Sequence, residues 1–248
     1  LKAALNRAVR ESEIAAVPYV QLLPASEPRE RIATASELAQ LMAAASTDRM
    51  RRYLVLAIGT AARPAAILEL TTSQCDLVDR FIQLNPRGRR QNKKRRPTIP
   101  MVEFLVPLIA EAEPGFIIAY ERKEESTTPG RRKQTVRVPL KGIRTPWRRM
   151  VAEAGRRIRL EACGRVRTLW RARRHAAAWK ALEEAKARVA ALREITPYVV
   201  RHTMATEMRR RGVEVWDVAG WLGHTTGYKT TERYAKVGPG VLAKAAAA

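Results

Sequence analysis

The sequence has few of the residues that build disulfide frameworks, metal sites or membrane spans. Its 248 residues include only two cysteines, Cys75 and Cys163, and three histidines. The cysteines lie far apart and match no metal-ligand spacing, so we expect two free thiols, a cytoplasmic protein and no bound metal. No apolar run approaches the roughly 18 residues that a membrane span requires. These absences argue against a disulfide-stapled domain, a metalloenzyme and a membrane protein.

Acidic residues are also scarce, because 24 Asp and Glu face 47 Lys and Arg, for a formal charge of +23. A charge of this size opposes compaction unless a polyanion neutralises it. Nucleic acid is the first partner to expect, and a membrane surface the second. Apolar residues make up 46% of the chain, which is enough for a core, and the segments rich in Ala, Leu and Arg favour helix.

The two ends of the chain differ from its middle. Residues 1–22 carry only a partial helical stripe and are followed by prolines and charges, so we expect residues 1–28 to be the end of an upstream domain plus a linker. Residues 29–238 form the main domain. Gly238-Pro239-Gly240 ends any helix, which leaves residues 239–248 as a tail.

Helix signals are clear in the first part of the main domain. Thr34 and Glu37 form a capping box that opens a helix, and a second helix runs through RMRRYLVLAIGTA. Pro64 suits the first position of a third helix, PAAILEL, which leaves Arg63 in the turn before it.

The hydrophobic period then changes to that of strands. VDRFIQLNP and RRPTIPM predict two short strands around the basic segment GRRQNKKRR, as an antiparallel hairpin. We interpret ERKEESTTPGRRKQTVR as a polar, mobile loop. The expected fold class is therefore mainly α with a small antiparallel β-sheet, an α+β arrangement.

The second half is helical by propensity. A helix begins at about Pro146 and ends near Gly155, and Trp216, Trp221 and Leu222 are expected in the core of a later helix. Residues 158–193 form a basic helical insertion. Either it adds contacts to DNA or to another protomer, or it is an inserted helix pair packed by Trp170, Trp179 and Leu182 with a solvated basic face; the sequence leaves both readings open.

Four polar residues stand at positions that helix packing does not explain. Arg63 lies in a turn, R-H-T occupies 201–203, L-G-H occupies 222–224 and R-Y occupies 233–234. In this order and spacing, on a basic chain, they resemble the tyrosine recombinase family, also called the phage integrase type. The resemblance covers roughly residues 30–238, which corresponds to the family's catalytic domain, and a C-shaped clamp on DNA is implied.

The chemistry suits these residue types. A tyrosine phenolate can keep a DNA phosphate as a covalent ester, and two arginine forks can hold the charge of the transition state through paired N–H···O contacts. The departing 5′-oxygen needs a proton from a cationic acid. No metal, ATP or other cofactor is implied.

The resemblance assigns a role to each residue. Tyr234 is the nucleophile, Arg63 and Arg201 clamp the phosphate, and His224 is a third phosphate contact. The acid is a hairpin lysine, for which Lys93 is our choice and Lys94 the alternative. The remaining charges of the hairpin are expected to contact the DNA backbone: Arg87, Arg89, Arg90, Lys94, Arg95 and Arg96.

Two positions depart from the family pattern. Tyr198 stands three residues before Arg201, where the family usually has histidine. A phenol, with an ordinary pKa near 10, is a poor base at neutral pH but can donate a hydrogen bond; we include Tyr198 among the catalytic residues in that role and expect activity to be retained. The family's acidic residue after the first arginine is absent at Ala65 and Ala66, and Glu69 is a candidate replacement.

The sequence therefore predicts a site-specific recombinase or integrase, of a mobile element or a chromosome, that acts on double-stranded DNA. It is expected to assemble as a tetramer on DNA, to be a monomer or dimer when free, and to lie in the cytoplasm of a bacterial or phage-infected cell. Two alternatives remain: a type IB topoisomerase-like enzyme that relaxes DNA, and a non-catalytic basic DNA-binding protein.

Overall fold

The computed structural model describes residues 1–21, 31–91, 94–124 and 134–224. It divides into two compact units, residues 1–30 and residues 31–248. In the first unit, α1 (Lys2–Arg10) is a short helix with no buried residue. The expected tail, residues 239–248, and part of the expected linker lie outside the described residues.

Helices dominate the second unit, as the composition predicts. Among the described residues they are α2 (Ala35–Ala44), α3 (Asp48–Thr60), α4 (Pro64–Leu68), α5 (Leu105–Ala110), α6 (Arg144–Arg171), α7 (His175–Glu194), α8 (Pro197–Arg210) and α9 (Val215–Leu222), with a 3₁₀ turn at Thr72–Gln74. The capping box predicted at Thr34 and Glu37 begins α2, and Pro64 is the first residue of α4.

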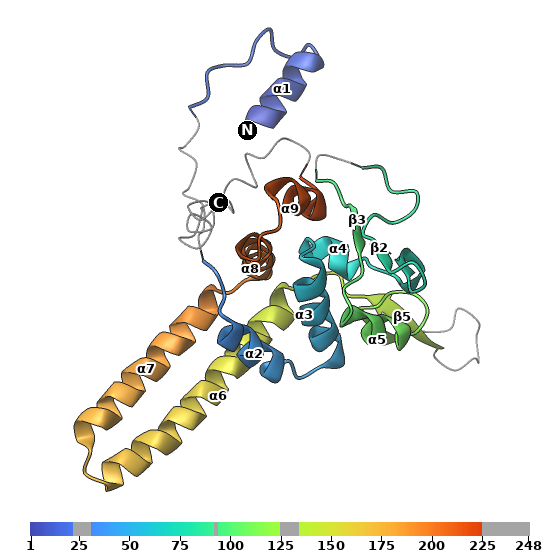
Figure 1. Ribbon diagram of the computed structural model, residues 1–248. Helices are drawn as coiled ribbons and strands as arrows, with labels where there is room; N and C mark the ends of the chain where they lie inside the picture. Colours follow the sequence, from blue (N-terminus) through green and yellow to red (C-terminus); the bar gives the residue numbers. More distant parts are fainter. Residues whose placement is uncertain (22–30, 92–93, 125–133, 225–248) are drawn as a thin grey trace, which may run out of the picture. The chain divides into compact units, whose positions relative to one another are not determined.

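Two small antiparallel sheets accompany these helices (Figure 1). The first has the order β1 (Cys75–Asp76), β2 (Phe81–Gln83) and β3 (Thr98–Pro100). Ile82 of β2 pairs with Ile99 of β3, and both side chains are buried. The predicted basic hairpin is confirmed, because its tip is the segment between β2 and β3.

The second sheet corrects an expectation. β4 (Ala119–Glu124) and β5 (Gln134–Pro139) pair across part of the segment that we interpreted as a mobile loop. Its strand residues are mostly polar or charged, and the only apolar alternation in them is the short one of Val136 and Val138 in β5. A pairing between two strands of one hairpin needs only a matched register of backbone groups, such as Tyr120 opposite Val138.

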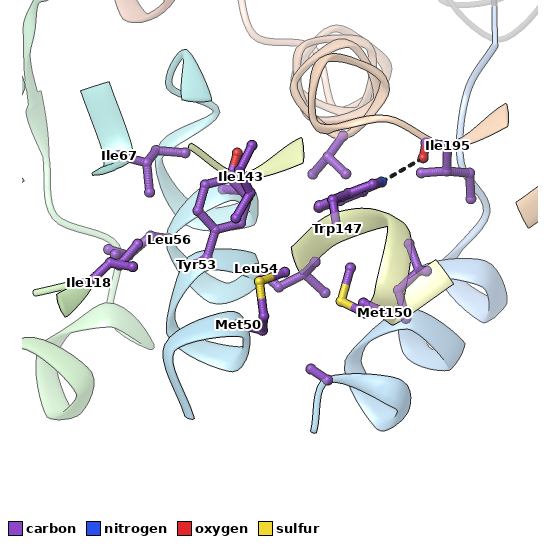
Figure 2. Packing of buried hydrophobic residues seen from close by; sticks show 14 of the residues in the cluster. Met50, Tyr53, Leu54, Leu56, Ile67, Ile118, Ile143, Trp147, Met150 and Ile195 are labelled. Atoms are coloured by element: carbon purple, nitrogen blue, oxygen red, sulfur yellow. Dashed lines mark hydrogen bonds between the residues drawn. The ribbon is translucent and has the colours of Figure 1, made fainter. Parts of the chain in front are cut away.

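The core of the second unit is centred on α3 and the first turns of α6. Tyr53 is fully buried and meets the ring of Trp147 edge to face, with the centroids 6.2 Å apart. The indole N–H of Trp147 donates to the backbone oxygen of Ile195 over 2.8 Å, which ties α6 to the residue that precedes α8 (Figure 2). These contacts fix the start of α8, which carries Arg201.

Helix α6 is longer than we predicted. We expected a helix end near Gly155, but α6 continues to Arg171 and packs antiparallel to α7. Gly155 is buried, and a Cβ there would lie 3.3 Å from a methyl group of Val189. This glycine therefore marks close packing of α7 against α6. Within residues 158–193, the part up to Arg171 continues α6, and α7 supplies the second helix of the hairpin.

Several tryptophans are more exposed than predicted. Trp170 and Trp179, expected to pack the insertion, have relative exposures of 49% and 58%. Trp216, expected in the core of α9, is 63% exposed, whereas Leu222 is fully buried as predicted and Trp221 is partly buried. The helical period of α9 explains the difference, because Trp216 does not share the inward face of Val218 and Leu222.

Candidate active site

Arg201 is the most tightly held residue of the predicted set. It lies in the second turn of α8, which begins at the Thr196 cap with Pro197 in the first position. Arg201 as a whole is 7% exposed, and its two Nη atoms donate to the backbone oxygens of Ala61 over 2.8 Å and Leu222 over 2.7 Å. These two contacts leave the guanidinium little freedom to rotate.

The two acceptor oxygens come from helix C-termini. Ala61 ends α3 in the left-handed conformation, with φ 48°, and Leu222 is the last residue of α9, before Gly223 with φ 65°. The final carbonyls of a helix have no intrahelical partner and carry partial negative charge, which favours a cation. The C-terminal ends of α3 and α9 therefore hold the guanidinium of Arg201 in place.

His224 follows directly from the end of α9. Its Nε2 lies 3.5 Å from a terminal nitrogen of Arg201. Burial, followed by the charges of Arg201 and Arg63, lowers the pKa of His224 to about 4. The imidazole is therefore neutral at neutral pH and can donate one ring N–H. The effect of both arginines on this pKa places the two guanidinium groups and the imidazole in one electrostatic environment.

Arg63 is the N-cap of α4, in the turn where the sequence placed it. It is half-buried, and its Nη1 donates to the backbone oxygen of Arg95 over 2.7 Å. Arg95 stands at the end of the basic hairpin tip, just before β3. The first arginine is thus bonded to the segment that carries the lysine candidates.

The same carbonyl of Arg95 also meets the end of α9. A Cβ added to Gly223 would lie 2.4 Å from this oxygen and 2.8 Å from Cδ of Pro97. Only a residue without a side chain fits this approach, and only glycine adopts its φ of 65° without cost. The glycine of L-G-H therefore holds α9, and His224 after it, against the base of the hairpin.

Arg96 is not placed as we predicted. It was expected to contact DNA, but its side chain is 7% exposed and its Nη1 lies 2.7 Å from a carboxylate oxygen of Glu69. The hydrogen bond from Arg96 lowers the pKa of Glu69. Glu69 follows α4, so this ion pair fastens the hairpin base to the far end of the helix that Arg63 begins.

The other residues predicted to contact DNA are at the surface. Arg87, Arg90, Lys94 and Arg95 are exposed, and Arg89 is half-buried with a bond to the side chain of Asn85. Tyr198, in the first turn of α8, is 64% exposed. Lys93 and Tyr234 lie outside the described residues.

The structure thus brings together Arg63 at the start of α4, Arg201 in the second turn of α8 and His224 after the end of α9. Sequence reasoning missed the backbone oxygens of Ala61, Leu222 and Arg95, since any residue type can supply a carbonyl. The one available signal was Gly223, whose place before His224 is typical of a helix C-terminus.

Comparison with models of protein families identifies the family of this chain. The family model described as the phage integrase family matches residues 31–239. The chain belongs to the phage integrase family. A comparison with curated protein sequences gives no match. The expected resemblance to tyrosine recombinases is confirmed, and the matched residues include all the predicted site residues.

Solved structures of tyrosine recombinases share the fold. The XerA recombinase matches with a TM-score of 0.51 and 19% identity over 90% of this chain, which spans 65% of the XerA chain. The integrase of transposon Tn1549, in complex with a circular intermediate DNA, matches with a TM-score of 0.57 and 17% identity, over 98% of this chain and 75% of its own. The same integrase in complex with transposon right end DNA gives a TM-score of 0.56.

Two further features bear on the candidate site. Within the described segments, no helix is both long and apolar enough to cross a membrane. Among those same residues, no three His, Cys, Asp or Glu side chains gather where they could hold a metal ion. The structure gathers guanidinium and imidazole groups, whose N–H donors suit an anionic ligand, and the backbone carbonyls hold the guanidinium groups in place.

Proposed function

We propose that this phage integrase family member is a site-specific DNA recombinase that cuts and rejoins strands through a 3′-phosphotyrosyl intermediate. The observation that carries the proposal is the fixed guanidinium of Arg201 beside His224, with Arg63 in the same electrostatic environment. Such a group of donors suits a phosphodiester, whose nonbridging oxygens carry the negative charge.

The proposed reaction is a transesterification. The phenol oxygen of Tyr234 attacks the scissile phosphorus, a P–O bond to tyrosine forms, and the bond from phosphorus to the 5′-oxygen breaks. The phenol gives its proton to water, and the 5′-oxygen takes one from Lys93, or from Lys94 in the alternative assignment. Attack by a 5′-hydroxyl of a second strand reverses these steps and releases the tyrosine. The bond energy is kept in the ester, so the step needs no cofactor.

The preorganised cations supply most of the stabilisation in this proposal. Arg201 is already oriented by two helix C-termini, so little reorganisation is needed when charge builds on the phosphate. His224, neutral before DNA binds, donates a hydrogen bond to a nonbridging oxygen. Tyr198, at i−3 from Arg201, can reach the same phosphate as a hydrogen-bond donor.

The wider organisation follows from the same proposal. Residues 29–238 form the catalytic domain, residues 1–28 connect it to an upstream domain, and residues 239–248 form a tail. The partner is double-stranded DNA in the cytoplasm of a bacterial or phage-infected cell. The Tn1549 integrase was solved with DNA, and exposed Arg87, Arg90, Lys94 and Arg95 suit backbone phosphates. Because exchange joins two duplexes, we expect a tetramer on DNA.

Strand exchange distinguishes this function from its alternatives. The full chain is incubated with two labelled duplexes that carry its target site, and separately with supercoiled plasmid. We expect recombinant products that disappear in Arg201→Ala, whereas the same change at exposed Arg193, in the last turn of α7, leaves them. Relaxation without exchange would favour a topoisomerase, and binding without any strand cleavage would favour a non-catalytic DNA-binding protein.

A further inference from the structure

The distal part of the α6–α7 hairpin is unlike the rest of the second unit. Figure 1 shows the paired ends of α6 and α7 extending beyond α2. The packing of α2 on α6 reaches Arg157, whose guanidinium donates to the oxygen of Ala43. Arg171, the last residue of α6, lies about 20 Å further along the helix at 1.5 Å per residue.

An apolar stripe runs along this exposed part of α6. Cys163, Val166 and Trp170 recur at the spacing of one helix face, and Leu182 of α7 completes a groove of about 400 Å³. Leu160, one turn before Cys163, is 58% exposed. A stripe of this kind on a helix normally packs against another helix. Among the residues that the structure describes, none fills this groove.

The rim of the groove is strongly basic. The acidic residues of the hairpin's distal part are already engaged, because Glu161 pairs with Arg188, Glu183 with Lys186, and Glu184 with Arg165. In the described part of the chain, no acidic side chain pairs with the remaining cations of the tip: Arg167, Arg171, Arg173, Arg174 and Lys180.

We propose that this groove is a docking site for an acidic amphipathic helix of a partner protein. An apolar face of such a helix would cover the stripe, and its flanking carboxylates would meet the guanidinium groups of Arg167 and Arg171 on the rim. The tip would then form a three-helix packing with the partner, in the helix-in-groove mode of recognition.

The apolar lining of the groove and the positive charge of its rim together favour an acidic amphipathic helix over the other possible occupants. Duplex DNA would neutralise the rim, but its phosphates and sugars offer no apolar ridge to fill a groove lined by Val166, Trp170 and Leu182. A second copy of the chain carries +23 and would add to the local positive charge. The chain's own α1 is basic, with Arg7 and Arg10 in its last turn. A negatively charged apolar helix satisfies both features at once.

The alkylation rate of Cys163 measures whether the groove is occupied, because this cysteine is exposed and lines the groove. Cys75 is an internal reference, since burial raises the pKa of its thiol to about 11 and suppresses the reactive thiolate. The full chain is treated with iodoacetamide, and the alkylation rate at each cysteine is followed by peptide mass.

The probe is an Ala-rich peptide of about 20 residues, long enough to form helix, with leucines on one face and glutamates on the others. At about ten times its dissociation constant, we expect alkylation of Cys163 to slow about tenfold, as mass action requires. A peptide of the same composition with its leucines permuted around the helix should not protect. Val166→Glu and the pair Arg167→Gln with Arg171→Gln should each weaken the binding of the amphipathic peptide.

Several outcomes would overturn the proposal. Equal protection by both peptides would show attraction by charge alone, and no protection by either would show that the groove takes no acidic helix. Protection of Cys163 by a short duplex DNA but not by the peptide would assign the tip to nucleic acid. Protection that rises with protein concentration in the absence of peptide would assign it to a second copy. Thermal unfolding of each variant checks that α6 and α7 remain folded.

Discussion

At the scale of single residues, Gly223 has the most demanding position in the site. It combines a positive φ with an approach to Arg95 that leaves no room for a Cβ. Its neighbour His224 depends on this geometry, because it follows the same helix end toward Arg201. Both its backbone conformation and its close approach to Arg95 therefore require glycine at position 223.

We expect Gly223→Ala to cost clearly more stability than Gly212→Ala. Gly212 also has a positive φ, of 87°, but nothing lies within 4 Å of an added Cβ. Both variants bear the left-handed strain of about 1–2 kcal/mol, while only Gly223→Ala must displace the hairpin base. Urea unfolding measures the difference, and equal losses in the two variants would contradict the close approach.

The pH dependence of stability tests the environment of His224. Its folded pKa of about 4 lies below the ordinary value of 6.5, so the unfolded chain binds the proton first as the pH falls. The stabilisation is complete above about pH 6.5 and is lost between there and about pH 4. We expect the parent chain to lose more unfolding free energy over this interval than His224→Gln does. Parallel losses in urea titrations across this pH range would show that the imidazole is not held neutral.

At the scale of elements, α4 and the basic hairpin behave as one piece. Arg63 at the start of α4 donates to the oxygen of Arg95, and Glu69 after its end pairs with Arg96. The two adjacent hairpin residues are thus held by both ends of one short helix. This double attachment fixes the base of the hairpin relative to the first predicted phosphate clamp.

Removing the carboxylate tests this attachment. Glu69→Gln leaves the buried guanidinium of Arg96 without its ionic partner, and we expect a loss of about 1–3 kcal/mol in the free energy of unfolding. Glu103→Gln, at an exposed site with the same change of charge, is the matched control. In the double variant with Arg96→Met, much of the loss should be recovered, because no unpaired charge remains. Independent, additive losses would mean that the two side chains do not interact.

Elements with strong local signals could be predicted from the sequence. The capping box of α2, the proline that begins α4 and the strands β2 and β3 around the basic tip follow from residues within a few positions of one another. The order of Arg63, Arg201 and His224 predicted that they would meet. Contacts between distant segments could not be predicted in this way.

The errors share a physical cause. The burial of Arg96 depends on Glu69, which lies 27 residues away, and a run of basic residues gives no sign that one member turns inward. Gly155 suggested a helix end, but it allows α7 to pack closely. β4 and β5 have few apolar residues, so their pairing rests on the backbone. In each case the tertiary partner, and not the local propensity, decides the outcome.

At the scale of the whole molecule, a strongly basic chain has a tyrosine recombinase fold in which Arg63, Arg201 and His224 form a candidate anion site. The charge of +23 predicts salt-dependent binding to DNA, because neutralised phosphates release counterions. In the proposed function, strand cleavage requires that a phenol reach the phosphate that Arg63 and Arg201 are proposed to hold. Tyr234 is the residue proposed for that step.

The most direct measurement is the identification of the residue that becomes linked to DNA. The full chain is trapped on a nicked target duplex from which the released fragment diffuses away, and the protein–DNA adduct is digested and mapped by mass spectrometry. The account predicts a 3′-phosphate ester on Tyr234 and no adduct in Tyr234→Phe, with unchanged DNA binding. An adduct on another residue, or one that persists in Tyr234→Phe, would contradict it.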